Sequence, residues 1–275
     1  MLNIFKTSED VFTASTIESY KALLNIVNII QPINIEYLVD NFKQNNPNLK
    51  ALFDRWYKSL NTGNVDYSVY VEDDYLNEIF DCWRKYSRKY LMSLRKYINS
   101  DNCDINIEDI NNVLDLGCGL GYTTICLYDI FKTAKKIYGT NFKDSIQFKV
   151  DNIVCNNFKD RINIIDENNT LSLESVDLVF ASEFFEHLDK PIDLLSNLIN
   201  TYHPKYLIIA NTFTQPAIGH FNSYYFNNIE YTGSEISKLF NNTLRSNNYY
   251  KLNTGFWNNR PTIWKLNNKH INKLF

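Results

Sequence analysis

Little in this chain points to a disulfide-bonded, membrane-bound or nucleic-acid-binding protein. Its 275 residues include five cysteines, an odd number without a Cys-x-x-Cys pair, which predicts a reduced and therefore cytoplasmic protein. No run of about eighteen apolar residues occurs, so no membrane-spanning helix is expected, and the first residues lack the pattern of a signal peptide. The net charge of −3 offers no basic field to a nucleic-acid backbone.

Apolar residues make up 44% of the chain, and in its N-terminal third they recur at helical spacing. Helices are predicted over residues 16–30, with Thr16 as N-cap, and over residues 34–42, 47–60 and 73–98. Residues 65–71 read as extended, and residues 1–15 show no clear pattern. We therefore expect an N-terminal helical cap over residues 1–104.

From residue 105 onward, short apolar runs alternate with helical stretches. Strands are predicted over residues 113–116, 136–140, 161–165, 176–181 and 206–210, and helices over 121–132, 143–156, 191–201 and 234–245. The end of the chain, residues 249–255 and 262–266, reads as a hairpin. Strands that alternate with helices form a parallel sheet with right-handed crossovers. Residues 105–275 are thus expected to form one α/β domain whose last strand is antiparallel.

Three of the eight glycines lie in one loop, Val113-Leu-Asp-Leu-Gly-Cys-Gly-Leu-Gly121. Glycine accepts positive φ and has no Cβ, so such a loop lets backbone N–H groups approach a ligand closely. A strand that leads into this loop, with a helix behind it, is the nucleotide-binding corner of a doubly wound sheet. The third glycine comes one residue earlier than in a dinucleotide fingerprint, which argues against a dinucleotide.

The pattern Asp115-x-Gly117-x-Gly119-x-Gly121 resembles the first motif of class I S-adenosylmethionine-dependent methyltransferases. The segment Val176-Asp-Leu-Val-Phe-Ala-Ser-Glu-Phe-Phe-Glu-His-Leu-Asp-Lys-Pro191 is similar to a second motif of that family. The resemblance covers roughly residues 105–266. It implies a Rossmann-like, mostly parallel seven-stranded sheet, with S-adenosylmethionine as cofactor held by Asp115 and the three glycines, and S-adenosylhomocysteine as product.

The resemblance also implies cofactor contacts at the ends of later strands. Where the family has an acid for the ribose hydroxyls, this chain has Asn141, which can accept one hydrogen bond but lacks the charge. Read without the family, Asn141 is a turn residue. In the family an acid after the third strand meets the adenine amino group, and Asp166 or Glu167 fits that position. Ser182 and Glu183 follow the fourth strand, where open α/β sheets bind ligands.

Two histidines are candidates for a general base that removes a proton from an acceptor hydroxyl, because imidazole titrates near neutral pH. His187 follows the fourth strand, and His220 lies in the loop 211–225, which in this fold covers the acceptor. His220 reads equally well as a surface residue. His203 and His270 are expected to have no role.

A metal site is the alternative interpretation of the same segment. Glu183, Glu186 and His187 fall within one helical turn, and with His220 they resemble the two-Glu, two-His site of methyltransferases that modify the 3′-terminal ribose of small RNAs. Glu-His-Leu is also widespread in metal-free methyltransferases, and His220 lies closer to the fifth strand than the second histidine of the RNA enzymes. A divalent metal is therefore possible but not favoured.

The tyrosines Tyr67, Tyr70 and Tyr75 precede the last helix of the cap and are expected to contact substrate, as in relatives whose N-terminal helices fold over the cofactor. The basic residues of that helix read as its solvated face, and contact with phosphates beside stacking tyrosines is the alternative: Arg84, Lys85, Arg88, Lys89, Arg95 and Lys96. The sequence thus predicts methyl transfer to a hydroxyl or other polar oxygen of a small acceptor, a sugar or phosphorylated metabolite that feeds a surface glycan. The alternatives are a metal-assisted RNA ribose 2′-O-methyltransferase and a non-catalytic binding subunit, which Asn141 suggests.

Overall fold

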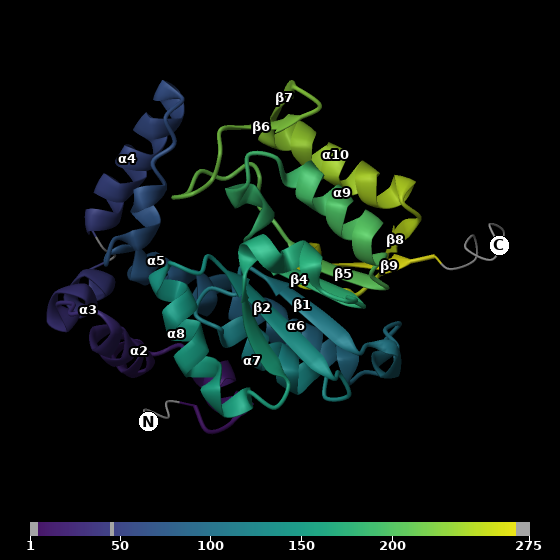
Figure 1. Ribbon diagram of the computed structural model, residues 1–275, viewed down its shortest axis with the longest axis horizontal. Coiled ribbons are helices and arrows are strands. Elements are labelled where there is room, and N and C mark those ends of the chain that lie inside the picture. The colour runs from purple at the N-terminus through teal and green to yellow at the C-terminus, as the bar shows by residue number, and fades with distance from the viewer. Residues whose placement is uncertain (1–4, 45–46, 268–275) are drawn as a thin grey trace.

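The computed structural model describes residues 5–44 and 47–267 and has a central sheet with helices on both faces (Figure 1). The sheet has seven strands in the order β3-β2-β1-β4-β5-β9-β8. Their bounds are β1 Asn112–Leu116, β2 Lys136–Asn141, β3 Ile162–Asp166, β4 Leu178–Ser182, β5 Tyr206–Ala210, β8 Tyr249–Lys251 and β9 Thr262–Leu266. Strand β9 runs antiparallel to both β5 and β8. The predicted mostly parallel sheet with an antiparallel last strand is confirmed.

The strand order explains where a ligand binds. From β1 the chain moves outward to β2 and β3, and then crosses back to β4 and β5. The connections therefore diverge between β1 and β4, and in open α/β sheets the crevice at this point lies at the carboxyl ends of the strands. Strands β4 and β5 are buried along their whole length, which is typical of central parallel strands covered on both faces.

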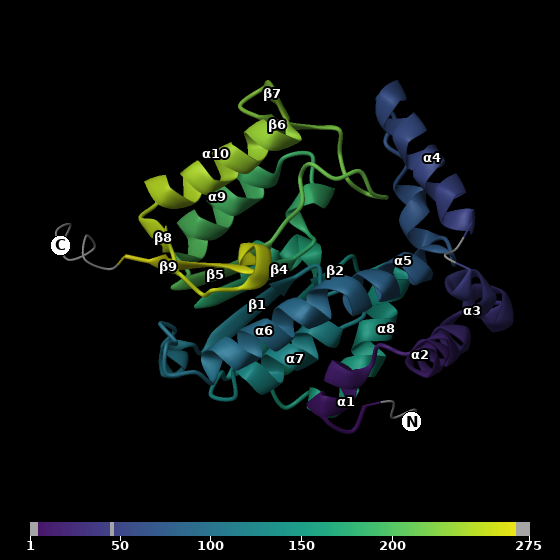
Figure 2. The ribbon, with the colours of Figure 1, turned by 180° about the vertical axis from the view of Figure 1, so that it is seen from behind.

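The helices that follow the strands agree with the predicted ranges to within a few residues. They are α7 Tyr122–Ile130, α8 Ile146–Val154, α9 Pro191–Tyr202 and α10 Gly233–Ser246. Ser145 caps α8, and Thr232 forms a capping box with Glu235 at the start of α10. Helices α9 and α10 cover one face of the sheet, while α7 and α8 cover the other (Figure 2).

The described part of the N-terminal region, residues 5–44 and 47–104, contains six α-helices, and it differs from the prediction in three places. The helices are α1 Ser8–Thr13, α2 Ile17–Ile30, α3 Ile35–Lys43, α4 Pro47–Thr62, α5 Tyr75–Cys82 and α6 Arg88–Ile98. Helix α1 was not expected; a capping box of Thr7 and Asp10 starts it. Residues 67–71 form a 3-10 turn instead of an extended segment, because the Asp66 side chain caps it. The predicted helix 73–98 contains a π turn, Trp83–Ser87.

A further hairpin was missed in the long loop after β5. Strands β6 (Ser223–Phe226) and β7 (Ile229–Thr232) pair antiparallel through Asn227 and Asn228, which both have positive φ. Two central residues with positive φ define the tight turn that fits the twist of a hairpin, and asparagine tolerates this conformation.

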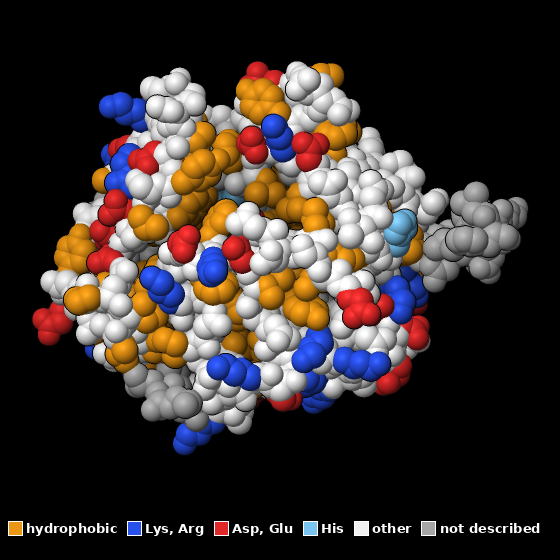
Figure 3. Space-filling model, in the orientation of Figure 1, with side chains coloured by type: hydrophobic (Ala, Val, Ile, Leu, Met, Phe, Trp, Pro, Cys, Tyr) orange, Lys and Arg blue, Asp and Glu red, His pale blue; other side chains and the backbone are white. Residues whose placement is uncertain are grey.

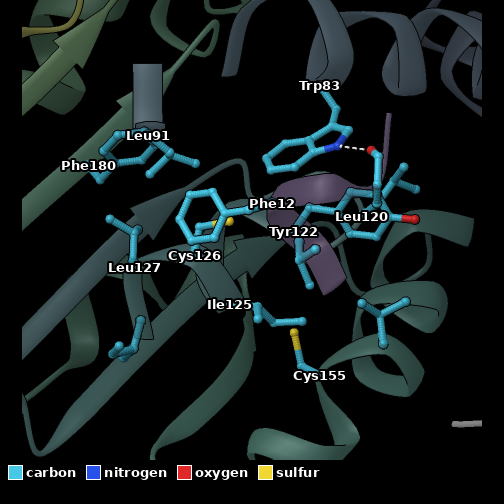
Figure 4. Packing of buried hydrophobic residues seen from close by; sticks show 14 of the residues in the cluster. Phe12, Trp83, Leu91, Leu120, Tyr122, Ile125, Cys126, Leu127, Cys155 and Phe180 are labelled. Carbon is cyan, nitrogen blue, oxygen red and sulfur yellow. Dashed lines mark hydrogen bonds between the residues drawn. The ribbon is translucent and has the colours of Figure 1, made fainter. Parts of the chain in front are cut away.

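One hydrophobic core joins the N-terminal helices to the sheet. Figure 4 shows Phe12 of α1 and Leu91 of α6 packed with residues of α7 and with Phe180 of β4. The indole of Trp83 also donates a hydrogen bond to the carbonyl of Ala14, at 2.7 Å. Within the described part of the chain, no helix combines the length and apolar character needed to cross a membrane. All five cysteines are free thiols.

Helix α4 reaches over the loop that follows β5. Its Trp56 is fully buried in a smaller apolar cluster with Val69, Tyr75 and Ile218. The Trp56 indole Nε1 donates a hydrogen bond to the backbone carbonyl of His220, at 2.7 Å. This contact ties the N-terminal helices to a loop more than 160 residues later in the chain.

Replacing Trp56 by phenylalanine should lower the free energy of unfolding by about 1–3 kcal/mol, because the buried His220 carbonyl loses its donor. Urea denaturation followed by circular dichroism measures this change. Trp257, which is 84% exposed, supplies the control: Trp257→Phe should change the stability by less than about 0.5 kcal/mol. Equal effects of the two variants would contradict the proposed importance of the α4 contact.

Candidate functional site

The loop between β1 and α7 can be built only from glycine at its key positions. Gly117, Gly119 and Gly121 have φ values of 62°, 59° and 77°. A Cβ on Gly117 would lie 2.4 Å from the ring of Phe184, and one on Gly121 would lie 2.8 Å from the sulfur of Cys155. A Cβ on Gly119 would meet nothing closer than 3.6 Å. The backbone at Gly119 is thus open to a ligand, which suits the S-adenosylmethionine that the sequence resemblance implies.

Asp115 supports this loop from behind. Its side chain is buried, and its Oδ2 accepts hydrogen bonds from the hydroxyls of Thr123 and Thr124, at 2.6 and 2.7 Å. Burial raises the pKa of Asp115 to about 7, against the opposing effect of the two hydroxyls. The carboxyl group therefore joins β1 to the start of α7, and it faces the helix rather than the opening of the loop.

The side chains at the ends of β2 and β3 lie beside the glycine loop. Asn141 donates through Nδ2 to the carbonyl of Gly119, at 2.8 Å. The carboxylate of Asp166 accepts hydrogen bonds from the backbone and the side chain of Asn168, so it closes a turn. Asp166 is therefore engaged in the turn through Oδ1. Burial, together with the neighbouring Asp166, raises the pKa of Glu167 to about 7.

The end of β4 contacts the helices of the N-terminal part. The hydroxyl oxygens of Ser182 and Ser87 lie 2.9 Å apart, and Tyr90 donates a hydrogen bond to Oε1 of Glu183, at 3.1 Å. Glu183 has a φ of 52°, an uncommon conformation for a residue other than glycine. Ser87 ends the π turn, and such turns occur frequently at functional sites.

Glu183 and Glu186 form a buried carboxyl pair. Glu186 is fully buried, and its Oε1 accepts a hydrogen bond from the backbone of Thr212, at 2.7 Å. Burial raises the pKa of both groups, and the nearby Glu183 raises that of Glu186 further. Arg260 acts in the opposite direction on Glu183. Both carboxyl groups are therefore weaker acids than a carboxyl group in water.

Sequence reasoning missed Arg260. It lies just before β9 and donates hydrogen bonds to the hydroxyl of Thr212 and the carbonyl of Asn211, at 2.8 and 3.0 Å. Arg260 lies in a polar turn more than 70 residues after Glu183 in the sequence. Only the strand order brings the start of β9 close to the end of β4, where Glu183 lies. No local pattern could have found it.

His187 and His220 lie edge to face, with their ring centres 4.8 Å apart. His220 Nδ1 is 2.7 Å from the carbonyl of Gln215. A carbonyl oxygen only accepts, so Nδ1 carries the proton and Nε2 is the basic atom. Burial lowers the pKa of both rings, that of His187 to about 3, so both are neutral at pH 7. Tyr70 approaches His187 Nδ1 with its hydroxyl at 3.2 Å.

The four groups of the alternative metal site do not form one site. The structure separates them into the carboxyl pair of Glu183 and Glu186 and the imidazole pair of His187 and His220. Glu186 and His220 each use one polar atom on a backbone group of the loop after β5. Among residues 5–44 and 47–267, no group of three or more His, Cys, Asp or Glu side chains could hold a metal ion. The side chains therefore do not fit the alternative metal arrangement.

The three tyrosines occupy different depths. Tyr67 is 55% exposed, Tyr70 is partly exposed beside His187, and Tyr75 is buried with its ring 5.1 Å from that of Tyr70. Tyr67 and Tyr70 are thus open to solvent in part, whereas Tyr75 is buried and packs against Tyr70. Figure 3 shows a hollow lined with apolar side chains between α4 and the β6–β7 hairpin.

The remaining charged candidates are engaged elsewhere or exposed. Arg84 and Lys85 pair with Asp81, and Arg95 pairs with Glu9 and Asp129. His203 is exposed at the end of α9, and His270 lies outside the described residues.

Comparison with known proteins identifies the fold through solved structures and the family through a sequence model. No match was found among curated proteins. Among solved structures, the mitomycin 7-O-methyltransferase MmcR has a TM-score of 0.52 at 10% identity, over 94% of this chain and 74% of that one. An O-methyltransferase family protein from Burkholderia thailandensis has a TM-score of 0.51 at 9% identity, over 82% of this chain and 70% of that one. At such identities the likeness shows the fold alone.

The sequence model of a family described as a methyltransferase domain matches residues 107–261, which is more than half of the chain. The match contains the glycine loop, the end of β4 and the loop after β5. The chain therefore belongs to this family and is a class I S-adenosylmethionine-dependent methyltransferase.

Proposed function

We propose that the protein transfers a methyl group to a hydroxyl, or another polar oxygen, of a small neutral acceptor. The observation that carries this proposal is the pair of neutral imidazoles beside the carboxyl ends of the strands, with Nε2 of His220 as the basic atom. A neutral imidazole can take the proton of a hydroxyl, which is what an oxygen acceptor needs and what an already nucleophilic amine or thiolate does not.

We assign the cofactor to the residues around the glycine loop. Gly117, Gly119 and Gly121 would hold its amino-acid end, Asn141 the ribose, and Glu167 the adenine amino group. Ser182 and Glu183 would lie beside its reactive end, while Asp115 keeps the loop in shape and Asp166 closes the turn before Glu167. When bound, S-adenosylmethionine supplies a methyl group on a sulfonium, which is a good leaving group. The protein then contributes mainly orientation and the exclusion of water.

Proton removal is assigned to His220. The acceptor hydroxyl would give its proton to Nε2, while Gln215 holds Nδ1 and so fixes the ring. His187, with its pKa near 3, is too weak a base for this step. Its ring orients His220 through the edge-to-face contact, and the Tyr70 hydroxyl in turn contacts His187.

The charges near the tyrosines favour a neutral acceptor, such as a sugar hydroxyl, over a phosphorylated metabolite. Burial raises the pKa of Tyr67, and the nearby Asp189 raises it further. Negative charge next to the acceptor position would repel a phosphate or an RNA backbone. Aromatic faces, by contrast, suit the apolar face of an uncharged ring.

The division of labour along the chain is also a proposal. Residues 1–104 would act as a cap that shapes the acceptor side, which the hydrogen bond from Trp56 to the His220 carbonyl supports. Residues 105–275 would bind the cofactor. Free thiols at all five cysteines support a reducing compartment, the cytoplasm.

The proposal is tested with isotopically labelled S-adenosylmethionine and a panel of neutral sugars, the matching sugar phosphates and a short RNA, analysed by mass spectrometry. Label should appear on an oxygen of a neutral acceptor, and a chelator should leave the rate unchanged. Label only on RNA, lost with the chelator, would favour the RNA ribose methyltransferase. A protein that binds no cofactor at millimolar concentration would instead be a non-catalytic binding subunit.

His220→Ala should lower kcat by about a hundredfold or more while the KM for the cofactor changes little, because only the proton acceptor is lost. In the unchanged protein, the pKa of His220 is lowered by burial, so the rate should fall only as the pH drops below 6.5. His203→Asn, a change at an exposed histidine, is the control and should keep the full rate. A His220 variant as active as this control would refute the role of His220.

Gly117→Ala should abolish cofactor binding in calorimetry, because the new Cβ would combine positive φ with a clash against Phe184. Gly63→Ala is the matched control: Gly63 has a φ of 71° but open space around the added Cβ. Gly63→Ala should cost about 1 kcal/mol of stability and leave the affinity unchanged. Equal losses of affinity in both variants would show that backbone strain anywhere impairs binding.

A further inference from the structure

A buried acid lies directly behind the residue that departs from the nucleotide-binding pattern. In nucleotide-binding sheets, an acid about twenty residues past the glycines binds the ribose hydroxyls, and here that position holds Asn141. Oδ2 of Asp151, on α8, lies 2.7 Å from Nδ2 of Asn141. Asp151 is fully buried. The carboxyl group that the pattern places at the end of β2 is thus present on Asp151, which lies behind Asn141.

The contacts of Asn141 fix which way its amide points. Nδ2 donates one hydrogen bond to the Gly119 carbonyl, at 2.8 Å, and another to Asp151. An amide nitrogen carries two N–H groups, so both are used. The amide oxygen is therefore the atom left for a ligand, and it can accept a hydrogen bond from a hydroxyl group. Nδ2 also lies 3.4 Å from the sulfur of Cys118, a weaker acceptor. Without Asp151, the shortest of the three contacts that select this orientation disappears.

Packing alone does not explain a carboxyl group at position 151. It lies on the buried face of α8 with Val150 and Val154, and α8 packs so closely on the loop that a Cβ on Gly121 would lie 3.0 Å from that of Asp151. Burial raises the pKa of Asp151 to about 8, and the groups that oppose this effect are the neutral Asn141, Cys118 and Asn152. A buried acid offset only by neutral groups is costly, which is typical of functional sites.

We propose that Asp151 is a positioning residue that holds the amide oxygen of Asn141 toward a ribose hydroxyl of the cofactor. The inference rests on the proposed cofactor site. In this assignment two residues share the role of a single ribose-binding acid. Asn141 contacts the ribose hydroxyl, and Asp151 fixes the direction in which the amide oxygen of Asn141 points. A residue that only attached α8 to the glycine loop would have no effect on which atom of Asn141 faces the ligand.

Exchanging the two side chains tests this assignment. In Asn141→Asp/Asp151→Asn, the carboxylate moves to the strand end and the amide behind it donates to it. This double variant and Asn141→Asp both lose the donor to the Gly119 carbonyl, so their pH dependence distinguishes them. The affinity of the double variant for S-adenosylmethionine should change by less than about threefold between pH 6 and pH 9. Asn141→Asp alone places two carboxyl groups in contact, which can share a proton at pH 6 but repel each other once it is lost. Its affinity should fall by about tenfold or more between pH 6 and pH 9.

Few other groups titrate next to Asp151. Cys118 of the glycine loop and Cys155 after α8 face it, and burial raises the pKa of both thiols well above the usual range. Asp115 of β1 interacts with the same two thiols and has a pKa near 7. Because Asp115 is unchanged in every variant, its titration is common to all of them and cancels in the comparison.

Calorimetry of S-adenosylmethionine binding at pH 6, 7.5 and 9 gives the affinities, and thermal melting confirms that each variant is folded. Asp151→Ala adds a second measure: it should weaken binding by about tenfold in a folded protein, since only Gly119 and the weakly accepting Cys118 then hold the amide of Asn141. Identical affinities and pH profiles for Asn141→Asp and the double variant would overturn the inference. An unchanged protein that binds no cofactor would instead overturn the proposed function.

Discussion

The structure depends on one close approach, that of the glycine loop to the side chains packed around it. Phe184 from the end of β4 occupies the space where Gly117 would carry a Cβ, and Cys155 does the same at Gly121. The hydroxyls of Thr123 and Thr124 on α7 hold the start of the loop through their hydrogen bonds to Asp115. Neighbours from three different parts of the chain therefore set the position of the loop. The loop is held rigidly for this reason, and so is the proposed cofactor side of the site.

The proposed acceptor side is built differently. Its residues come from loops and from the N-terminal helices: His220 from the segment after β5, His187 from a short turn, and Tyr70 from a 3-10 turn. Loops positioned by a rigid framework commonly carry the residues that choose a substrate. The proposed cofactor half thus follows from the general architecture of the sheet, whereas the proposed acceptor half depends on loops and on the N-terminal helices.

Much of the framework could be predicted from the sequence, since buried parallel strands and amphipathic helices have strong local periodicity. The glycine loop could be predicted because three glycines within five positions indicate a backbone with positive φ, which glycine adopts most readily. The pairing of Asn141 with Asp151, the approach of Arg260 to Glu183 and the separation of the carboxyl and imidazole pairs could not be predicted, because tertiary packing alone decides them. The β6–β7 turn had a local signal in Asn227-Asn228, since asparagine tolerates positive φ. Asp66 was a similar signal for the 3-10 turn at residues 67–71, where reading the hydrophobic periodicity alone predicted an extended segment.

The π turn at Trp83–Ser87 sets how this region can change during evolution. One extra residue in a helical turn rotates everything that follows by about 100°. That rotation allows a nearly continuous helix to pack Phe80 against Tyr20 and then to direct Ser87 and Tyr90 at the end of β4. Substitutions on this helix alter one contact at a time, whereas loss of a single residue would turn the whole second half away from the sheet. Relatives that align without a gap here should therefore keep the same N-terminal arrangement, however far their side chains have diverged.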